Sequence, residues 1–215
     1  MSRRGVIHVV DDDCSFRTAV TRMLTATGLS VQTFGSGTEL LAHLAGAPSM
    51  DEPGCVLADL RMPGIDGLQL QQACGDAGVD LPFVFLTGKG DLPSAVSAMR
   101  QGAVDFLDKC APQGALLSAL EQALERSASA RASHAQREQL ERRFAALTVR
   151  ESEVLTQVVH GKMNKQIAAA LGIHERTVKL HRSAITTKLG VRSVAELTTL
   201  ARRTGRFEEP QQPCP

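Results

Sequence analysis

The sequence predicts an α/β domain with a five-stranded parallel, doubly wound sheet, followed by a small all-α domain of four helices. Short apolar runs alternate with helical patterns through residues 1–124, whereas residues 147–206 contain helical patterns alone. Charge divides the chain in the same way: residues 1–125 carry a net charge of −7 and residues 126–215 carry +8, which together give +1. An acidic half joined to a basic half predicts two domains with different partners.

Five short apolar runs predict the strands, because each has four or five residues and is bounded by polar or turn-forming residues. Strands that are apolar throughout and joined by helices are typical of a parallel sheet covered on both faces. The predicted strands are Val6–Val10, Val31–Phe34, Cys55–Ala58, Pro82–Leu86 and Val104–Leu107.

Helical patterns follow each of these strands in turn. Asp13 is expected to cap the first helix, Ser36–Glu39 forms a capping box for the second, and Pro93 lies in the first turn of the fourth. The predicted helices are Phe16–Thr27, a helix after Ser36 through Leu44, Gly67–Cys74, Leu92–Arg100 and a fifth that starts at Pro112.

The predicted boundaries place the first domain at residues 1–124 and the all-α domain at 147–206. Residues 125–146, rich in Ala, Arg, Glu, Gln and Ser without Gly or Pro, predict a helical linker. The Pro/Gln-rich residues 207–215 predict a disordered tail.

Four helical patterns fill the all-α domain. Capping boxes begin the first and the last, at Thr148–Glu151 and Ser193–Glu196, and Gly161, Gly172 and Gly190 lie where helices end. Between them, Asn164–Leu171 and Glu175–Leu189 predict a short helix and a longer one.

Composition excludes several classes of protein. Aromatic residues make up 3% of the chain, with no Trp or Tyr, which argues against base-stacking platforms for single-stranded nucleic acid. The five cysteines lack zinc or C-x-x-C spacing and predict free thiols in a reducing cytoplasm. No apolar run predicts a signal peptide or a membrane span, so no membrane partner is expected.

Residues that can bind a metal ion or a phosphoryl group follow four of the strands. In a parallel sheet these strand ends meet at one edge, where ligands bind. Carboxylates without thiols or imidazoles favour Mg²⁺, and a neutralised cluster leaves one carboxylate able to attack phosphorus. The residues concerned are Asp11, Asp12 and Asp13 after the first strand, Asp59 after the third, Thr87 and Gly88 after the fourth and Lys109 after the fifth.

The segments Val9–Asp13, Ala58–Gly67, Leu86–Gly88 and Asp105–Lys109 resemble, in order and spacing, the motifs of receiver domains. The resemblance implies a flavodoxin-like fold in which a sensor histidine kinase phosphorylates an aspartate. It assigns the phosphoacceptor to Asp59, the Mg²⁺ ligands to Asp11, Asp12, Asp59 and the backbone carbonyl of Arg61, phosphoryl binding to Thr87, Gly88 and Lys109, and an aromatic switch to Phe106.

Two positions leave alternatives open. Phe106 fits an ordinary core aromatic nearly as well as a switch. Receiver domains usually have Pro after the lysine, commonly with a cis bond, but Cys110 stands there in this chain. Because a cis bond before a non-proline residue is costly, we expect a trans loop that is placed differently.

The longer basic helix has two faces. Val178, Ile185 and Leu189 are expected to pack inward, and a polar, basic stripe lies roughly opposite. With the short helix before it, this helix predicts a helix-turn-helix whose stripe enters the major groove of DNA. The stripe comprises Arg176, Lys179, Leu180, Ser183 and Thr187, and His181, Arg182 and Lys188 flank it as predicted phosphate contacts.

The amino-acid sequence of this domain is similar to that of the LuxR-type DNA-binding domain over Leu147–Val191. The resemblance adds Asn164, Lys165 and Thr177 to the predicted DNA-binding residues. One departure is His174, which stands where Ser often begins the recognition helix and is a poorer cap.

Together the two resemblances imply a two-component response regulator of the NarL/FixJ class rather than an enzyme. Phosphorylation of Asp59 is expected to promote homodimerisation through the Leu92–Phe106 surface and binding to promoter DNA, with RNA polymerase as a further candidate partner.

Two alternatives remain at this point. A phosphorylation-independent regulator would use an atypical first domain for dimerisation or ligand sensing. A phosphatase of the dehalogenase type is disfavoured, because Arg61 stands where its second acid is usually needed.

Overall fold

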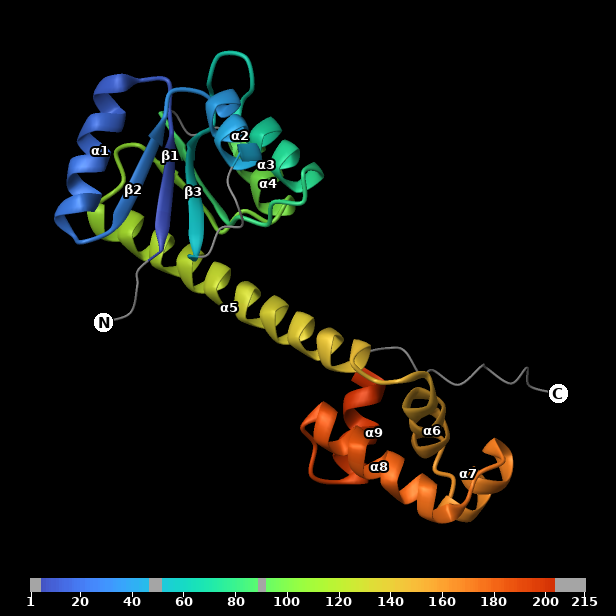
Figure 1. Ribbon diagram of the computed structural model, residues 1–215. Coiled ribbons are helices and arrows are strands. Elements are labelled where there is room, and N and C mark those ends of the chain that lie inside the picture. Colours follow the sequence, from blue (N-terminus) through green and yellow to red (C-terminus); the bar gives the residue numbers. More distant parts are fainter. Residues whose placement is uncertain (1–4, 47–51, 89–91, 204–215) are drawn as a thin grey trace. The chain divides into compact units, whose positions relative to one another are not determined.

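The computed structural model describes residues 5–46, 52–88 and 92–203 (Figure 1). The chain forms two compact units, residues 1–133 and 134–215. The predicted tail, residues 207–215, lies outside the described residues. Within the described ranges no helix has both the length and the apolar character needed to cross a bilayer.

The first unit contains the predicted five-stranded parallel sheet. Its strand order is β2-β1-β3-β4-β5, and every neighbouring pair is parallel. This order confirms the predicted doubly wound fold, with strand limits that differ from the predicted ones by at most one residue. The strands are β1 (Val6–Val10), β2 (Ser30–Phe34), β3 (Gly54–Asp59), β4 (Phe83–Thr87) and β5 (Asp105–Asp108).

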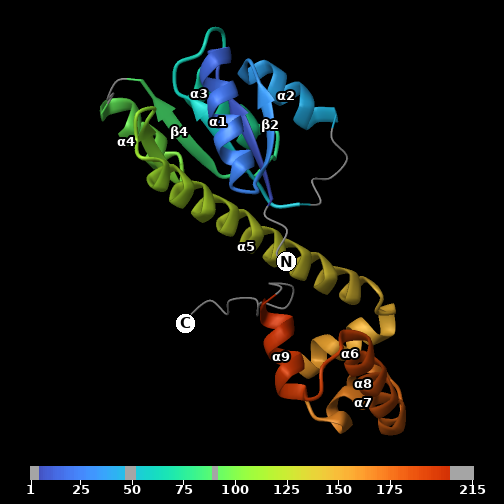
Figure 2. The same cartoon turned by 90° about the vertical axis from the view of Figure 1, so that its left-hand side faces the viewer.

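Helices cover both faces of the sheet because consecutive strand residues point to opposite sides (Figures 1 and 2). Leu57 of β3 packs into one core with α1 (Cys14–Ala26) and α5 (Gln113–Ala145). Val56, next to it in sequence, packs into the other core, with helices on the opposite face. Those helices are α2 (Gly37–Gly46), α3 (Gly67–Asp76) and α4 (Leu92–Arg100).

Helix α5 includes almost all of the predicted helical linker. Beyond residue 124 it still contacts the first unit: the Ser127 hydroxyl accepts a hydrogen bond from the Gly54 N–H at 3.1 Å. Arg126 donates to the Gly102 carbonyl, also at 3.1 Å. The polar contacts of the first unit therefore extend a few residues past the predicted boundary at 124.

His8 is a buried polar residue in the middle of an otherwise apolar strand. It is 1% exposed, and its ring lies near Phe34 of β2 and His43 of α2. Burial, together with the nearby His43, lowers the pKa of His8 from 6.5 to about 4.

Because the folded pKa of His8 is lowered, its contribution to stability is complete above pH 6.5 and is lost as the pH falls through about 4. We expect this residue to reduce the free energy of unfolding by about 3 kcal/mol over that range. Urea denaturation at a series of pH values tests this by comparing wild type with His8→Leu. Equal pH dependence in the two proteins would contradict the prediction.

The second unit is the predicted four-helix domain. It contains α6 (Val149–Val159), α7 (Asn164–Leu171), α8 (Glu175–Leu189) and α9 (Val194–Arg203). Helix α8 packs against both α6 and α7 (Figure 2). The predicted inward residues of α8 are fully buried, alongside apolar residues of the other three helices and Phe144 of α5.

The start of α8 lacks a side-chain cap. Gly172 ends α7 in the left-handed conformation, at φ +65°. The next helix then begins after His174, whose side chain makes no capping hydrogen bond. The first N–H groups of α8 therefore receive no acceptor from the His174 side chain, unlike those of α6, where Thr148 and Glu151 form the predicted capping box.

Replacing His174 with Ser is expected to stabilise the second unit by about 1 kcal/mol, because the serine hydroxyl can accept a hydrogen bond from the first turn. Urea denaturation monitored by helical circular dichroism measures the change. His174→Ala is the matched control, since it removes the imidazole without adding an acceptor. A gain that Ala reproduces in full would show that capping is not its cause.

Candidate metal centre and nucleic-acid interface

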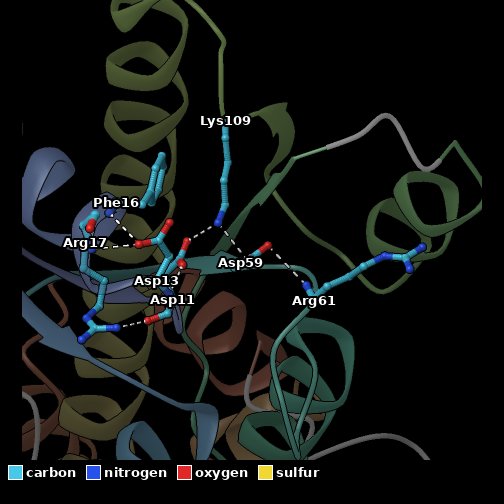
Figure 3. Close-up of polar contacts among 8 residues, drawn as sticks. Asp11, Asp13, Phe16, Arg17, Asp59, Arg61 and Lys109 are labelled. Carbon is cyan, nitrogen blue, oxygen red and sulfur yellow. Dashed lines mark hydrogen bonds and ion pairs between the residues drawn. The ribbon is translucent and has the colours of Figure 1, made fainter.

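Acidic residues from two strands meet at one edge of the sheet (Figure 3). Asp11 follows β1 directly and Asp59 is the last residue of β3. The parallel register pairs Val10 with Ala58, so the residues that follow each of them lie side by side.

Three carboxylates form the candidate metal site. One oxygen from each of Asp11, Asp12 and Asp59 lies within 4.8 Å of the others. Asp11 is 1% exposed, Asp59 is nearly buried and Asp12 is exposed, so the cluster opens to solvent on one side. Such oxygen donors fit a hard divalent cation, and a cation would offset the cost of keeping these charges close together.

Lys109 supplies the positive charge at this edge. Its Nζ atom lies 2.6 Å from Asp11 Oδ2 and 2.9 Å from Asp59 Oδ2. Burial raises the pKa of Asp11, against the opposing effect of Lys109. Burial lowers the pKa of Lys109, but the two carboxylates outweigh it and raise that pKa above its ordinary value. The ammonium therefore stays charged and acts as the internal counterion of both acids.

Backbone and side-chain hydrogen bonds hold Asp11 in place. The Asp13 N–H donates to Asp11 Oδ1 at 2.9 Å. Arg17 of α1 donates to the Asp11 carbonyl. Asp13 itself caps α1, as predicted, by accepting from the N–H groups of Ser15 and Phe16. This cap starts α1 at Cys14, two residues earlier than predicted.

Thr87 and Gly88 lie at the same edge of the sheet as Asp59, because Leu86, the residue before Thr87, pairs with Asp59. Thr87 ends β4, its side chain is buried, and its carbonyl accepts a hydrogen bond from the Lys109 N–H at 2.8 Å. Gly88 is exposed, and a Cβ atom at this position would meet open space. The edge therefore has room for a further group beside Thr87.

Arg61 and Phe106 are the two remaining residues to which the resemblance assigns a role. The Arg61 N–H donates to Asp59 Oδ1 at 3.3 Å, while its side chain extends away from the cluster (Figure 3). Phe106 lies in β5, half-buried, and packs against the core that contains α3 and α4. Its surroundings are compatible with both a core role and a switch role.

The loop after β5 is trans, as expected for a chain with Cys110 in place of Pro. The Cys110 N–H donates to Asp108 Oδ1 at 2.7 Å, which fixes the loop locally. With Cys110 in place of Pro, Lys109 reaches both acids.

One contact of Lys109 was not predicted. Its Nζ atom lies 4.5 Å from the centroid of the Phe16 ring, which α1 contributes to the site (Figure 3). Nothing in the local sequence pattern distinguishes Phe16 from other apolar residues at the start of a helix. A contact between residues so far apart in the chain follows only from the fold.

The outward face of α8 is open to solvent. All of the predicted stripe is exposed, and Leu180, at 65%, is an unusually exposed large apolar residue. The stripe comprises Arg176, Lys179, Leu180, Ser183 and Thr187. Lys165 of α7 is also exposed, whereas Asn164, Thr177 and His181 are half-buried. A basic helix face with a protruding apolar side chain suits the major groove of DNA.

Two flanking residues have partners inside the unit. Arg182 donates to Asn164 Oδ1 at 2.7 Å and so joins α8 to α7. Lys188 pairs with the nearly buried Glu151 at 2.7 Å and donates to the Ala146 carbonyl at 3.2 Å. Lys188 holds the pKa of Glu151 below its ordinary value. These contacts give both cations a structural role that the sequence pattern did not indicate.

The chain is similar to known families in both halves. The family described as the response regulator receiver domain matches residues 7–121. The family described as bacterial regulatory proteins, luxR family, matches residues 145–201.

Relatives match the chain over most of their own length. Nodulation protein W of Bradyrhizobium diazoefficiens is 37% identical over 95% of this chain and 88% of its own length. Transcriptional regulatory protein FixJ of Azorhizobium caulinodans is 38% identical over 93% of this chain and 92% of its own.

Solved structures agree with the described fold. The structure of response regulator StyR has a TM-score of 0.83 and 42% identity, covering 92% of this chain and 98% of StyR. Full-length FixJ from B. japonicum has a TM-score of 0.57 and 35% identity, covering 96% of this chain and all of FixJ.

Proposed function

Because the chain belongs to the response regulators of the NarL/FixJ class, which join a receiver domain to a LuxR-type DNA-binding domain, we propose that phosphorylation of Asp59 controls its binding to DNA. It is a two-component transcription factor, with a sensor kinase and DNA as the partners that its domains imply. Because DNA is one of these partners, we place the protein in the cytoplasm. The relatives are transcriptional regulators, which leaves the phosphatase alternative without support.

The observation that supports Asp59 as the acceptor is its position beside both Lys109 and the other acids. Asp59 Oδ2 lies 2.9 Å from the Lys109 ammonium, and Asp59 also shares the acidic cluster with Asp11 and Asp12. A carboxylate oxygen of Asp59 attacks the phosphorus of a phosphohistidine that is protonated on its other ring nitrogen, the P–N bond breaks, and neutral imidazole leaves with that proton. In this proposal Lys109 balances the charge on one phosphoryl oxygen, and Thr87 donates a hydrogen bond to another.

Receiver domains bind Mg²⁺, and the three carboxylates of this chain fit such an ion. Asp11, Asp12 and Asp59 would hold it, with the Arg61 carbonyl as a further ligand. When bound, Mg²⁺ neutralises the charge that builds up between the carboxylates and the transferring phosphoryl group.

Labelling with acetyl phosphate tests this assignment. We expect wild type to gain the mass of one phosphoryl group when Mg²⁺ is present. It should remain unlabelled when EDTA is present throughout. Asp59→Asn should remain unlabelled, because an amide is a poor nucleophile. Unlabelled wild type would instead support the alternative, a regulator whose receiver serves for dimerisation or ligand sensing.

The expected output of phosphorylation is dimerisation and DNA binding. On α4, Val96 is 47% exposed and Met99 is 50% exposed, an apolar patch within the predicted Leu92–Phe106 dimer surface. Two recognition helices in a dimer would reach neighbouring half-sites, and RNA polymerase is a further candidate partner. Sedimentation and binding to duplex DNA, each measured with and without acetyl phosphate, test both steps. Unchanged mass and affinity on a labelled protein would contradict the coupling.

A further inference from the structure

Lys109 is followed by Cys110 rather than by the proline that is usual in receiver domains. Its backbone is fixed, because the Lys109 N–H donates to the Thr87 carbonyl at 2.8 Å. The hydrogen bond from the Cys110 N–H to Asp108 fixes the residue that follows. Neither contact restrains the four-carbon side chain, which is flexible and carries the charge at its far end.

The contacts of the ammonium differ in how they depend on the state of the site. Asp11 and Asp59 hold the Nζ atom at 2.6 and 2.9 Å. Under the proposed function, both carboxylates take new partners when the cation binds and the phosphoryl group is transferred. The Phe16 ring, at 4.5 Å, is neither ionised nor modified in any of these steps.

Phe16 is itself held firmly enough to act as a support. It lies in the first turn of α1, three residues after the Asp13 cap, and its N–H donates to the Asp13 carboxylate at 3.2 Å. Its side chain is half-buried and packs against the core between α1, α5 and the sheet. The face of such a ring attracts a cation, most strongly where water is partly excluded. The Lys109 side chain is 19% exposed, which meets that condition.

We propose that Phe16 is a positioning residue for phosphoryl transfer: its ring keeps the Lys109 ammonium directed at Asp59 while the carboxylate partners of Lys109 change. This inference rests on the proposed function. Phe16 touches neither the acceptor oxygen nor the phosphoryl group and acts only through Lys109.

A series of substitutions at position 16 separates the charge attraction from simple packing. Phe16→Leu keeps an apolar side chain without a ring, and Phe16→Tyr keeps the ring. Replacing Phe16 with 3,4,5-trifluorophenylalanine keeps the ring's shape while removing most of its attraction for cations. Phe34→Leu is the matched control, since Phe34 is half-buried in the other core and lies next to His8 and His43.

The rate of labelling by acetyl phosphate at saturating Mg²⁺ is the first measurement. We expect the Leu and trifluoro proteins to be slower than wild type by between about twofold and thirtyfold. Tyr should restore the rate and Phe34→Leu should leave it unchanged. In a Lys109→Met background, Phe16→Leu should cause no further loss, because the residue on which the ring acts is gone. Equal rates for wild type, Leu and trifluoro proteins, or an equal loss from Phe16→Leu in both backgrounds, would overturn the proposal.

The NMR shift of the Lys109 ε-methylene protons is the second measurement and does not depend on phosphorylation. A ring face beside the ammonium should move these protons upfield in wild type and Phe16→Tyr but not in Phe16→Leu. If wild type is not labelled but shows the upfield shift, the proposed function fails while the contact stands. If wild type is labelled and the shift is the same in all variants, the positioning role fails alone.

Discussion

Replacing Lys109 with Met is expected to slow phosphorylation of Asp59 by about two to three orders of magnitude, the usual cost of removing one group that stabilises a developing negative charge. The ammonium lies within hydrogen-bonding distance of Asp59 Oδ2, and Met has a comparable length without charge or donors. The rate of acetyl phosphate labelling at saturating Mg²⁺ measures the change. A rate within a few-fold of wild type would remove Lys109 from the proposed mechanism.

The same substitution should strengthen Mg²⁺ binding. Without Lys109 the buried Asp11 loses the cation 2.6 Å away, so an added divalent ion no longer competes with an internal one. We expect Mg²⁺ to raise the urea midpoint of the first unit more in Lys109→Met than in wild type. Lys162→Met, the same change at an exposed residue of the second unit, is the control and should behave as wild type.

Replacing both Arg176 and Lys179 with Ala is expected to weaken binding to a specific DNA site by about a hundredfold or more, since each base-reading side chain contributes about 1–3 kcal/mol. Both side chains are exposed on the outward face of α8, so their removal should leave the domain fold unchanged. The site is first selected from randomised duplexes with wild type. Titration of that duplex at several salt concentrations then gives the affinity and its salt dependence.

Two arginines on α5 provide the control for charge. Arg137→Ala combined with Arg142→Ala removes the same net charge from exposed positions on α5, where each arginine pairs with a glutamate. If this variant loses as much affinity as the α8 variant, the effect is general electrostatics and α8 does not read bases. If the α8 variant loses affinity equally for specific and unrelated duplexes, its residues contact phosphates instead.

Much of the fold follows from local pattern. Alternation of apolar strands with helices determines a parallel sheet, and the carboxyl ends of parallel strands share one edge. These two rules are sufficient to predict that Asp11, Asp59 and Lys109 lie together. Helix limits are predicted best where capping residues mark them, as at Thr148 and Gly190.

Contacts between distant side chains are beyond such patterns. The position of Lys109 against Phe16 depends on how α1 packs on the sheet, and the pairing of Lys188 with Glu151 depends on how α8 crosses α6. The pattern around His8 indicates only an apolar strand. It does not indicate that burial lowers the pKa of this residue. Periodicity reports which face of an element turns inward but not which residues meet there.

The pairing of Glu151 with Lys188 has a consequence for cooperativity. One carboxylate completes the first turn of α6 by accepting from the Thr148 N–H and also secures the last turn of α8 through Lys188. The two helices are therefore expected to open together rather than fray in sequence, so that backbone amides in both exchange with deuterium at a common rate. A recognition helix coupled in this way remains preorganised in the absence of DNA. The entropic cost of ordering it on binding is therefore small.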